Sequence, residues 1–572
     1  MEGRATKLRR LNEFRRRRPH VTASALAETL KGVQEEGLPP LHTRNQLRES
    51  RDLICTEKTP FGPIAQAITV VDNQDRPKRI AIASPFALLY TAINTSVALA
   101  NLFESRLDVC PSSPETPWNM ILYSDEITPG NPLQTKNKRK FQGVYFTFLE
   151  FGPHALSREE TWFPLMTEYS LVVNNVQATM SQVFGEIIKF CFQTDGLNFL
   201  TGGISLPIRG GTRFWAKLGI FLQDGAAQTM TWSARAGACR LCLLCNNIFT
   251  EQSQVVDADG SHLLRCNVVK EEDCELSTDD GLRNVARYLE GKAGTMLASH
   301  FDDLQKALGL THRPYSLLLD RNLDSIVKPT EQYMHDWMHT LFADGIANLN
   351  VYLLFEAFFN EDRRQVYELF RGFAKRWIWP RKHYSAHLPD IFAADRTESQ
   401  RKAKHIKCQA SDMMSLLPVL AYFVHSVLMP TGLCAEACQT FLAMCDMCDF
   451  ITSVNRGRIT PSMIRKSVER FMQLFLLTFG AAWMTPKMHW LLHMSRAYSK
   501  WGVLLACFVN ERYHRFPKQY ATDLKNTSHN GGLSLLKEVI CHTLSNLSAP
   551  KALDFSIGPV HPRTAKKKSS RC

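Results

Sequence analysis

The sequence predicts an α/β protein in which a small sheet is combined with a large all-helical segment. Two runs rich in aromatic and β-branched or other apolar residues, Trp118–Ser124 and Gly143–Leu149, are separated by a loop containing Pro, Gly and Asn, as in a long β-hairpin. The run Phe214–Leu222 has a similar strand-like composition. Between residues 345 and 480, in contrast, long apolar segments favour helices.

Length and composition are those of a large globular protein with a basic excess. The 572 residues are 45% hydrophobic and 22% charged, which is enough for large cores and roughly two to four domains. Lys and Arg number 68 against 55 Asp and Glu, giving a net charge of +13. A balance of this size predicts a polyanionic partner, nucleic acid before an acidic membrane.

The sixteen cysteines are expected to be thiols or metal ligands. No apolar run follows the basic residues 1–20, so no signal peptide is expected and a reducing compartment is indicated. No segment is expected to reach the length of a membrane span; Met414–Met429 contains His425 and is interpreted as a buried helix. Neither a phosphate-binding Gly-x-x-x-x-Gly-Lys loop nor a clear dinucleotide fingerprint indicates nucleotide-driven chemistry.

The chain begins with a basic arm, residues 1–20, and ends with a basic tail whose charges gather in 561–572. Both ends fit nuclear targeting or non-specific phosphate contact, and both fit a solvated segment with no role. Residues 21–53 have a short helical pattern, which suits a small DNA-binding unit or a packing arm. One or two helices are expected within Ala83–Leu107.

Two predicted strands end in an aspartate. Asp125 follows the first strand, and Asp224 follows the run that ends at Leu222. On one sheet these carboxylates would converge at an edge, where active sites are commonly built. Aspartate at a strand end is also common turn chemistry. Between them, Ser170–Val173 is expected to be a strand and Met180–Phe192 a helix.

A cysteine-rich element follows Asp224. Cys239, Cys242 and Cys245 form two overlapping Cys-x-x-Cys spacings. Two thiolates three positions apart can bind one tetrahedral zinc, with two further ligands downstream. We expect Cys242, Cys245 and Cys266 to be ligands, and the fourth to be His262, Cys239 or Cys274. The alternative is a set of buried thiols.

A second group of candidate residues is His335, Asp336 and His339. Asp336 and His339 are three positions apart, so this acid and this imidazole would share a helical face. This arrangement fits metal ligation or proton transfer, and it also fits a capped helix start. In the helical segment that follows, a further group of cysteines is interpreted mainly as core: Cys434, Cys438, Cys445 and Cys448.

A single acid, Glu511, follows the apolar run Val503–Val509 and stands among basic residues. The neighbouring positive charge should keep this carboxylate ionised. An ionised carboxylate beside basic residues suits a divalent cation and a phosphate together. An ion-paired helix at the edge of a core is the alternative. The basic neighbours are Arg512, His514, Arg515 and Lys518.

Several of these stretches resemble one family. Thr485-Pro-Lys-x-His-x-Leu-x-His493, then Gly502 and Phe508-x-x-Glu-Arg-x-His-Arg515, resembles the C-terminal catalytic block of cut-and-paste transposases of the CACTA type, which have an RNase H-like fold. Asp336-Trp-Met-His339 is similar to the Asp/Cys-x-x-His signature of those enzymes and of the related hAT group. Cys242-Leu-Leu-Cys245 and Leu122-Tyr-Ser-Asp125 look like the family's Cys-x-x-Cys element and first strand. The resemblance covers roughly 118–520.

The resemblance implies a DDE active site with Asp125, Asp224 and Glu511 as its three acids, and with Asp336 and His339 as an accessory pair. Two Mg²⁺ or Mn²⁺ ions about 4 Å apart would then activate water or a DNA 3′-hydroxyl and stabilise the leaving oxygen. Asp195 is a rival for an acid position, and Asp336 could itself be the second acid. The residues expected to hold the DNA backbone are Arg512, Arg515 and Lys518.

The resemblance also implies an organisation and a function. Residues 21–110 would be a helical N-terminal region, 111–344 an RNase H-like core with a zinc element at about 239–274, 345–484 a helical insertion, 485–550 the C-terminal catalytic helix region and 551–572 the tail. The expected function is cutting and joining double-stranded DNA at transposon ends in the nucleus, with a homodimer possible. The alternatives are an inactive, transposase-derived DNA-binding or scaffold protein and, more remotely, a zinc-stabilised interaction module.

Overall fold

The computed structural model describes residues 23–37, 43–129, 139–235, 237–238, 240, 242–247, 268–362, 365–379, 387–523, 531–548 and 555. The chain divides into two compact units, Met1–Thr56 and Glu57–Cys572. The first contains two helices, α2 (Ala23–Glu36) and α3 (Arg44–Thr56), as the pattern of 21–53 predicted.

The second unit begins with a hairpin that the sequence did not predict. Strands β1 (Ala65–Val71) and β2 (Pro77–Ala83) pair in antiparallel register. The helices predicted within 83–107 follow as α4 (Pro85–Thr95) and α5 (Val97–Val109). Ser84 and Ser96 cap their N-termini by accepting from the backbone N–H three residues on, which explains why the two helices start at these serines.

A five-stranded mixed sheet lies at the centre of this unit, in the order β5-β4-β3-β8-β9. The predicted hairpin is confirmed as the antiparallel pair β3 (Trp118–Ile127) and β4 (Phe141–Phe148). Strand β5 (Phe163–Tyr169) is antiparallel to β4, whereas β8 (Ala216–Gln223) and β9 (Tyr333–His335) continue the sheet parallel to β3. The molecule is therefore a mixed α/β protein, as the sequence predicted.

Two strand predictions differ from the structure in detail. The run 214–222 is interrupted at Trp215: β7 (Thr212–Phe214) pairs with β6 (Ile204–Leu206) outside the central sheet. The prediction of a strand at Ser170–Val173 was wrong, because these residues form the short helix α7 directly after the edge strand β5. The predicted helix Met180–Phe192 is confirmed as α8.

Helices bury the sheet. Every residue of β4 and β5 is buried, which is typical of strands covered on both faces. Helix α24 (Gly531–Ser548) packs against β5, and α9 (Gly225–Trp232) packs against β3 and β8. Aromatic side chains fill the core at one end of β3, where the Phe103 and Trp118 rings stack with centroids 5.8 Å apart.

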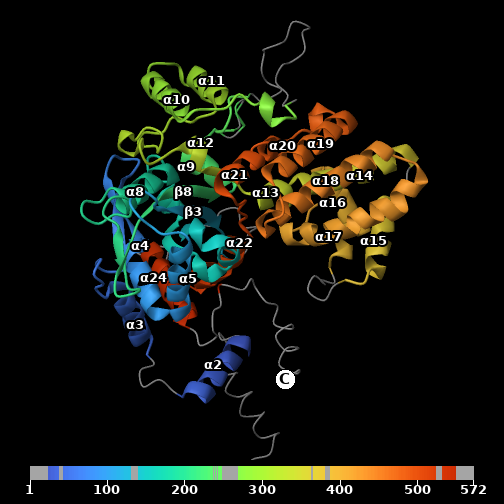
Figure 1. Ribbon diagram of the computed structural model, residues 1–572. Coiled ribbons are helices and arrows are strands. Elements are labelled where there is room, and N and C mark those ends of the chain that lie inside the picture. The colour runs from blue at the N-terminus through green and yellow to red at the C-terminus, as the bar shows by residue number, and fades with distance from the viewer. Residues whose placement is uncertain are drawn as a thin grey trace, which may run out of the picture. The chain divides into compact units, whose positions relative to one another are not determined.

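The predicted all-helical segment is confirmed and forms the yellow-to-orange cluster beside the sheet (Figure 1). Its core is one continuous apolar cluster that includes Cys438, Cys445 and Cys448, as expected for these cysteines. Cys434 directly precedes the helix Ala435–Ser453 and donates to the Glu361 carboxylate at 2.7 Å. The helices are α14 (Ile346–Asp362), α15 (Val366–Arg376), α16 (Ala394–Ala403), α17 (Ala410–Phe423), α18 (Ala435–Ser453) and α19 (Pro461–Phe479).

Among the described residues, two helical stretches are long and apolar enough to cross a membrane, Trp337–Asp362 and Ala410–Thr431, and a bent pair, α4 with α5, would make a third if it were one span. The expectation that no segment reaches this length was therefore wrong. In the first stretch 72% of the apolar window is buried inside the protein, and in the second 44%, because both belong to packed helices.

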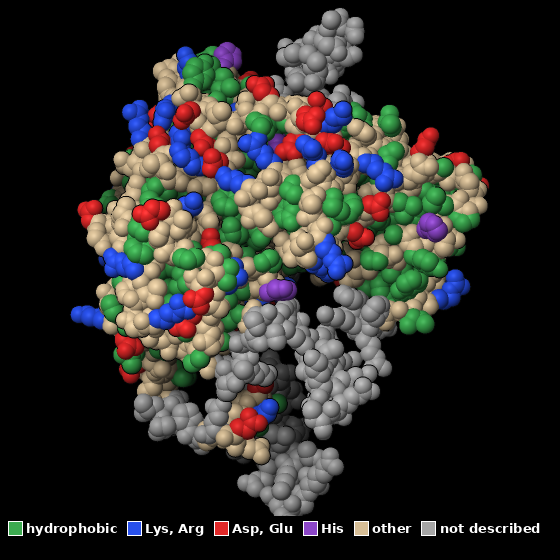
Figure 2. Space-filling model, viewed as in Figure 1, with side chains coloured by type: hydrophobic (Ala, Val, Ile, Leu, Met, Phe, Trp, Pro, Cys, Tyr) green, Lys and Arg blue, Asp and Glu red, His purple; other side chains and the backbone are tan. Residues whose placement is uncertain are grey.

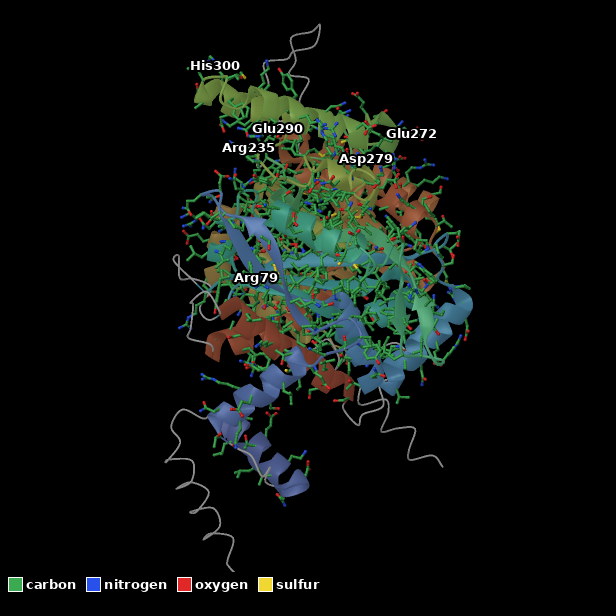
Figure 3. The ribbon with its side chains drawn as sticks, turned by 90° about the vertical axis from the view of Figure 1, so that its left-hand side faces the viewer. Arg79, Arg235, Glu272, Asp279, Glu290 and His300 are labelled. Carbon is green, nitrogen blue, oxygen red and sulfur yellow. The ribbon has the colours of Figure 1, made fainter. Side chains whose placement is uncertain are left out.

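Further helices complete the unit. The pair α10 and α11 carries exposed polar side chains such as Glu290 and His300 (Figure 3). Helix α22 lies next to the sheet at β3 (Figure 1). These helices are α6 (Gly152–Leu156), α10 (Asp279–Lys292), α11 (Ala298–Leu308), α12 (Pro329–Gln332), α13 (Trp337–Leu341), α20 (Pro486–Leu491), α21 (Met494–Trp501), α22 (Phe508–Tyr513) and α23 (Arg515–Asp523).

Candidate functional site

The register of the three parallel strands aligns three aspartates. Ser124 of β3 pairs with Gln223 of β8, and Gln223 pairs with His335 of β9. Because parallel strands end at the same edge of a sheet, the residues that follow this row reach that edge together. They are Asp125, Asp224 and Asp336. The Gln223 amide donates to the Ser124 hydroxyl at 2.8 Å and fixes the strand ends against each other.

Asp125 lies closest to the other acids. Its side chain is 19% exposed, and the Tyr123 hydroxyl donates to its Oδ2 atom at 3.2 Å. Burial raises the pKa of Asp125 well above its ordinary value, and the charges of Asp224 and Glu511 raise it further. Ligand atoms of Asp125 and Glu511 lie within 4.8 Å of each other, and Asp224 ends the neighbouring strand.

Asp224 has a structural task as well. It is the N-cap of α9, and its Oδ1 atom accepts from the Ala227 N–H at 2.7 Å. No hydrogen bond to its Oδ2 atom occurs within the described part of the chain. The two interpretations of this strand-terminal aspartate, turn former and site acid, are therefore compatible.

Glu511 approaches Asp125 from α22. Its Oε2 atom is 3.7 Å from His514 Nδ1, and the same nitrogen is 3.6 Å from Asp125 Oδ2. Burial acts to raise the pKa of Glu511, but the contacts with His514, His339 and Lys518 outweigh it and lower that pKa. The Glu511 carboxylate therefore stays charged, as its basic neighbours predicted.

Asp336 holds the surrounding segments in place. It caps α13, is 3% exposed, and accepts from the backbone N–H of Met338, His339 and Cys507. Its Oδ2 atom also contacts His339 Nδ1 closely. Ligand atoms of Asp336, His339 and Cys507 lie within 4.8 Å of one another, whereas Asp224 belongs to none of the metal-capable groups among the described residues. Asp336 has both oxygens engaged and Asp224 has one, so both stay candidates for the second acid. Asp336 and His339 were predicted to share a helical face. Instead, Asp336 follows β9 and caps α13, and it contacts His339 within that helix.

His339 connects Asp336 to Glu511. Its Nε2 atom lies 4.0 Å from Glu511 Oε1. Although burial acts to lower it, the pKa of His339 is raised to about 9 by Asp336, Asp224 and Glu511. His339 is therefore a cation beside the acids at neutral pH. Asp195, the rival acid, lies exposed in a turn after α8 and belongs to none of the metal-capable groups among the described residues.

A separate, buried group of four side chains has the composition of a metal site. Ligand atoms of Cys242, Cys245, His489 and His493 all lie within 4.8 Å of one another. Cys245 Sγ is 3.0 Å from His489 Nε2, which is 3.2 Å from His493 Nε2. Contacts with Cys242 and Cys274, followed by those with the two imidazoles, lower the pKa of Cys245, so this thiol is readily a thiolate.

The structure adds two residues to the predicted ligand set. Cys242 and Cys245 lie together, and the other two members of their group are His489 and His493, which were not predicted as ligands. Of the other predicted ligands, His262, Cys266 and Cys239 lie outside the described residues, and Cys274 is buried beside Cys245. The missed signal is the His-x-x-x-His spacing that begins in α20, 244 residues after Cys245.

His335 belongs beside this group rather than beside the acids. Its ring stacks on Trp490 with centroids 5.0 Å apart, and its Nε2 atom is 3.9 Å from Cys242 Sγ. Burial lowers the pKa of His335 well below its ordinary value. The last residue of β9 therefore lies beside the Cys/His group, while the next residue, Asp336, lies at the edge of the sheet with the other aspartates.

The basic residues predicted beside Glu511 lie on α22 and α23. Arg512 is exposed, donates to the Ser157 carbonyl at 3.0 Å and lies 3.4 Å from Glu159. Arg515 is exposed over the Phe516 ring, and Lys518 is half-buried.

In comparisons with known proteins, no family model matches the chain, and no curated protein matches it.

Proposed function

We propose that this protein is a DDE-type, transposase-like enzyme that cuts and joins DNA by metal-assisted phosphoryl transfer on an RNase H-like sheet. The observation that supports the proposal is that Asp125 and Asp224 follow aligned ends of neighbouring parallel strands, and that Glu511, far away in the chain, lies with Asp125 in one metal-capable group. Their order, first strand, later strand and final helix after a helical segment, is the order that the resemblance implies.

The acid group fits divalent cations. Carboxylate oxygens are the preferred ligands of Mg²⁺ and Mn²⁺, and burying three of them together is costly unless protons or cations offset their repulsion. Asp125 lies in one metal-capable group with Glu511, and Asp224 follows the neighbouring strand, so these three residues would hold the ions. When bound, the ions would activate a water or a 3′-hydroxyl and stabilise the leaving oxygen.

The neighbouring groups would keep the acids in place. Cys507, at the start of α22, donates its N–H to Asp336 at 3.1 Å, so the helix that carries Glu511 is anchored to the end of β9. His339 adds positive charge beside Glu511. Arg512, Arg515 and Lys518 would hold the DNA backbone without reading sequence.

The Cys/His group would hold a structural zinc. Two thiols and two imidazoles are a common tetrahedral zinc set, and all four side chains are buried. The ion would connect the segment after β8 to α20, which leads through α21 to the helix bearing Glu511. Nuclear location, duplex DNA as partner and a possible homodimer complete the proposal.

The test is metal-dependent nicking of supercoiled plasmid and joining of a 3′-hydroxyl oligonucleotide, with Mg²⁺ or Mn²⁺. Asp125→Asn and Glu511→Gln should each lower the rate at least 100-fold, while the exposed Asp195→Asn control keeps it. Equal nicking by wild type and both acid variants would contradict the assignment. Salt-sensitive DNA binding with no metal-dependent cleavage would favour the inactive, transposase-derived DNA-binding protein.

A further inference from the structure

His514 faces two of the three acids at once. Its Nδ1 atom is 3.6 Å from Asp125 Oδ2 and 3.7 Å from Glu511 Oε2. A metal ligand atom from each of these three residues lies within 4.8 Å of the other two. The group therefore offers two oxygens and one nitrogen from a strand and the end of a helix.

The imidazole is buried between aromatic rings. His514 is 1% exposed and lies against the Tyr123 and Tyr145 rings, with centroids 5.8 and 6.1 Å away. Its other nitrogen, Nε2, is buried and has no hydrogen-bond partner within the described residues. The packing thus directs one nitrogen at the acids.

The separations suit a shared cation better than a direct hydrogen bond. N–H···O bonds in proteins span about 2.7–3.2 Å, shorter than both distances from Nδ1. Atoms that ligate one cation at about 2.1 Å lie roughly 3.0–3.4 Å apart, which a small closure of this group reaches. His339, the other nearby imidazole, is 4.0 Å from Glu511 and its Nδ1 atom contacts Asp336.

We propose that His514 is the third protein ligand of the metal ion held between Asp125 and Glu511, and that its nitrogen biases this position toward a transition-metal ion such as Mn²⁺ over Mg²⁺. This inference rests on the proposed function, which requires an ion at the acids. Mg²⁺ is bound almost entirely by oxygen, whereas imidazole ligands favour transition metals.

The test is Mn²⁺ binding to the zinc-loaded full chain, followed by electron paramagnetic resonance. In wild type, pulsed spectra should show the ¹⁴N coupling of a directly bound imidazole. His514→Phe keeps the aromatic packing and removes the nitrogen, so the coupling should disappear and Mn²⁺ affinity should fall at least about tenfold, with a smaller change for Mg²⁺. His514→Asn offers an oxygen near the Nδ1 position and should restore binding without the coupling.

Matched controls separate the outcomes. His339→Phe should keep the ¹⁴N coupling, as should His300→Phe at the exposed position on α11 (Figure 3). Mn²⁺ bound in wild type without coupling, or coupling that persists in His514→Phe, would overturn the role of His514 and leave the proposed function standing. Mn²⁺ binding that is absent in wild type, or unchanged in Asp125→Asn, would overturn both.

Discussion

Asp336 and Asp224 show how one residue type takes different tasks at equivalent positions of neighbouring strands. Both follow the same register row, and both cap the helix that comes next. Asp336 also accepts from Cys507 and contacts His339, which engages both of its oxygens. Asp224 uses one oxygen for its cap. Hydrogen bonding, rather than position on the strand, is what differs between the two aspartates.

This difference predicts the effect of neutralising each aspartate. Asp336→Asn should retain Mn²⁺ at the acid group, although it weakens the cap and the His339 contact by about 1–3 kcal/mol. Asp224→Asn should lower Mn²⁺ affinity at least about tenfold while an amide oxygen still caps α9. Titration of the free Mn²⁺ signal measures both. If Asp336→Asn loses the ion and Asp224→Asn keeps it, Asp336 is the second acid.

Glu168 carries a prediction about pH. This β5 carboxyl is 4% exposed, and burial raises its pKa to about 7. Because the folded pKa exceeds the unfolded value, its burial penalises the folded state increasingly as pH rises from about 4.5 to 7. Glu168→Gln should therefore stabilise the protein by about 1–3 kcal/mol at pH 8 and by less than about 1 kcal/mol at pH 5.

Urea unfolding midpoints at the two pH values check this prediction, with Glu436→Gln as an exposed control. The Glu168 Oε1 atom accepts from the Tyr169 N–H at 2.9 Å, and a glutamine oxygen keeps this bond. A midpoint difference that is the same at both pH values would show that the effect is packing rather than ionisation.

At the scale of elements, the sequence was informative wherever the signal was local. The hairpin around Ser124 and Val144, helix α8 and the helical segment followed from composition and periodicity over short windows. The strand at 170–173 failed because β-propensity in Val172 and Val173 does not oppose a single helical turn. The β1–β2 hairpin and the three-residue strand β9 were too short or too mixed to predict.

The acids and the metal-capable cysteines were predictable only in part. Asp125 and Asp224 were proposed because strand ends are a local feature, and Cys242 and Cys245 because their spacing is one. That His489 and His493 face those cysteines is a tertiary fact, set by the packing of α20 against α13. The position of His514 between Asp125 and Glu511 likewise depends on how α22 meets β3.

The zinc assignment gives a prediction at this scale. The purified chain should contain one zinc, which Cys242→Ser or His489→Ala removes, whereas His262→Ala and Cys266→Ser retain it. Elemental analysis and chelator release measure this. Loss of zinc should also lower the melting temperature, because metal binding stabilises the folded state. If the His489→Ala variant retains its zinc and the Cys266→Ser variant loses it, the ligand set first predicted from the sequence is the correct one.

At the scale of the whole molecule, charge is unevenly distributed along the sequence. Residues 1–22 contain eight Lys or Arg against two Glu, and 549–572 contain six against one Asp, so the ends account for most of the net charge of +13. On the face shown in Figure 2, basic and acidic side chains alternate over the surface. The basic excess is therefore concentrated in sequence at the termini rather than in one broad patch on that face.

The ends are thus expected to dominate non-specific DNA affinity, while the acid group determines chemistry. Replacing Arg15–Arg18 and Lys566–Lys568 with Gln should weaken DNA binding and make it less sensitive to salt, by about one unit of the log–log slope for each side chain that contacts a phosphate. Fluorescence anisotropy of a labelled duplex from 50 to 200 mM salt measures the slope, with Asp125→Asn as a variant that should leave it nearly unchanged. A slope equal to wild type after these seven neutralisations would instead place the phosphate contacts on the folded surface, with Arg512, Arg515 and Lys518 the first residues to replace, because they lie beside Glu511.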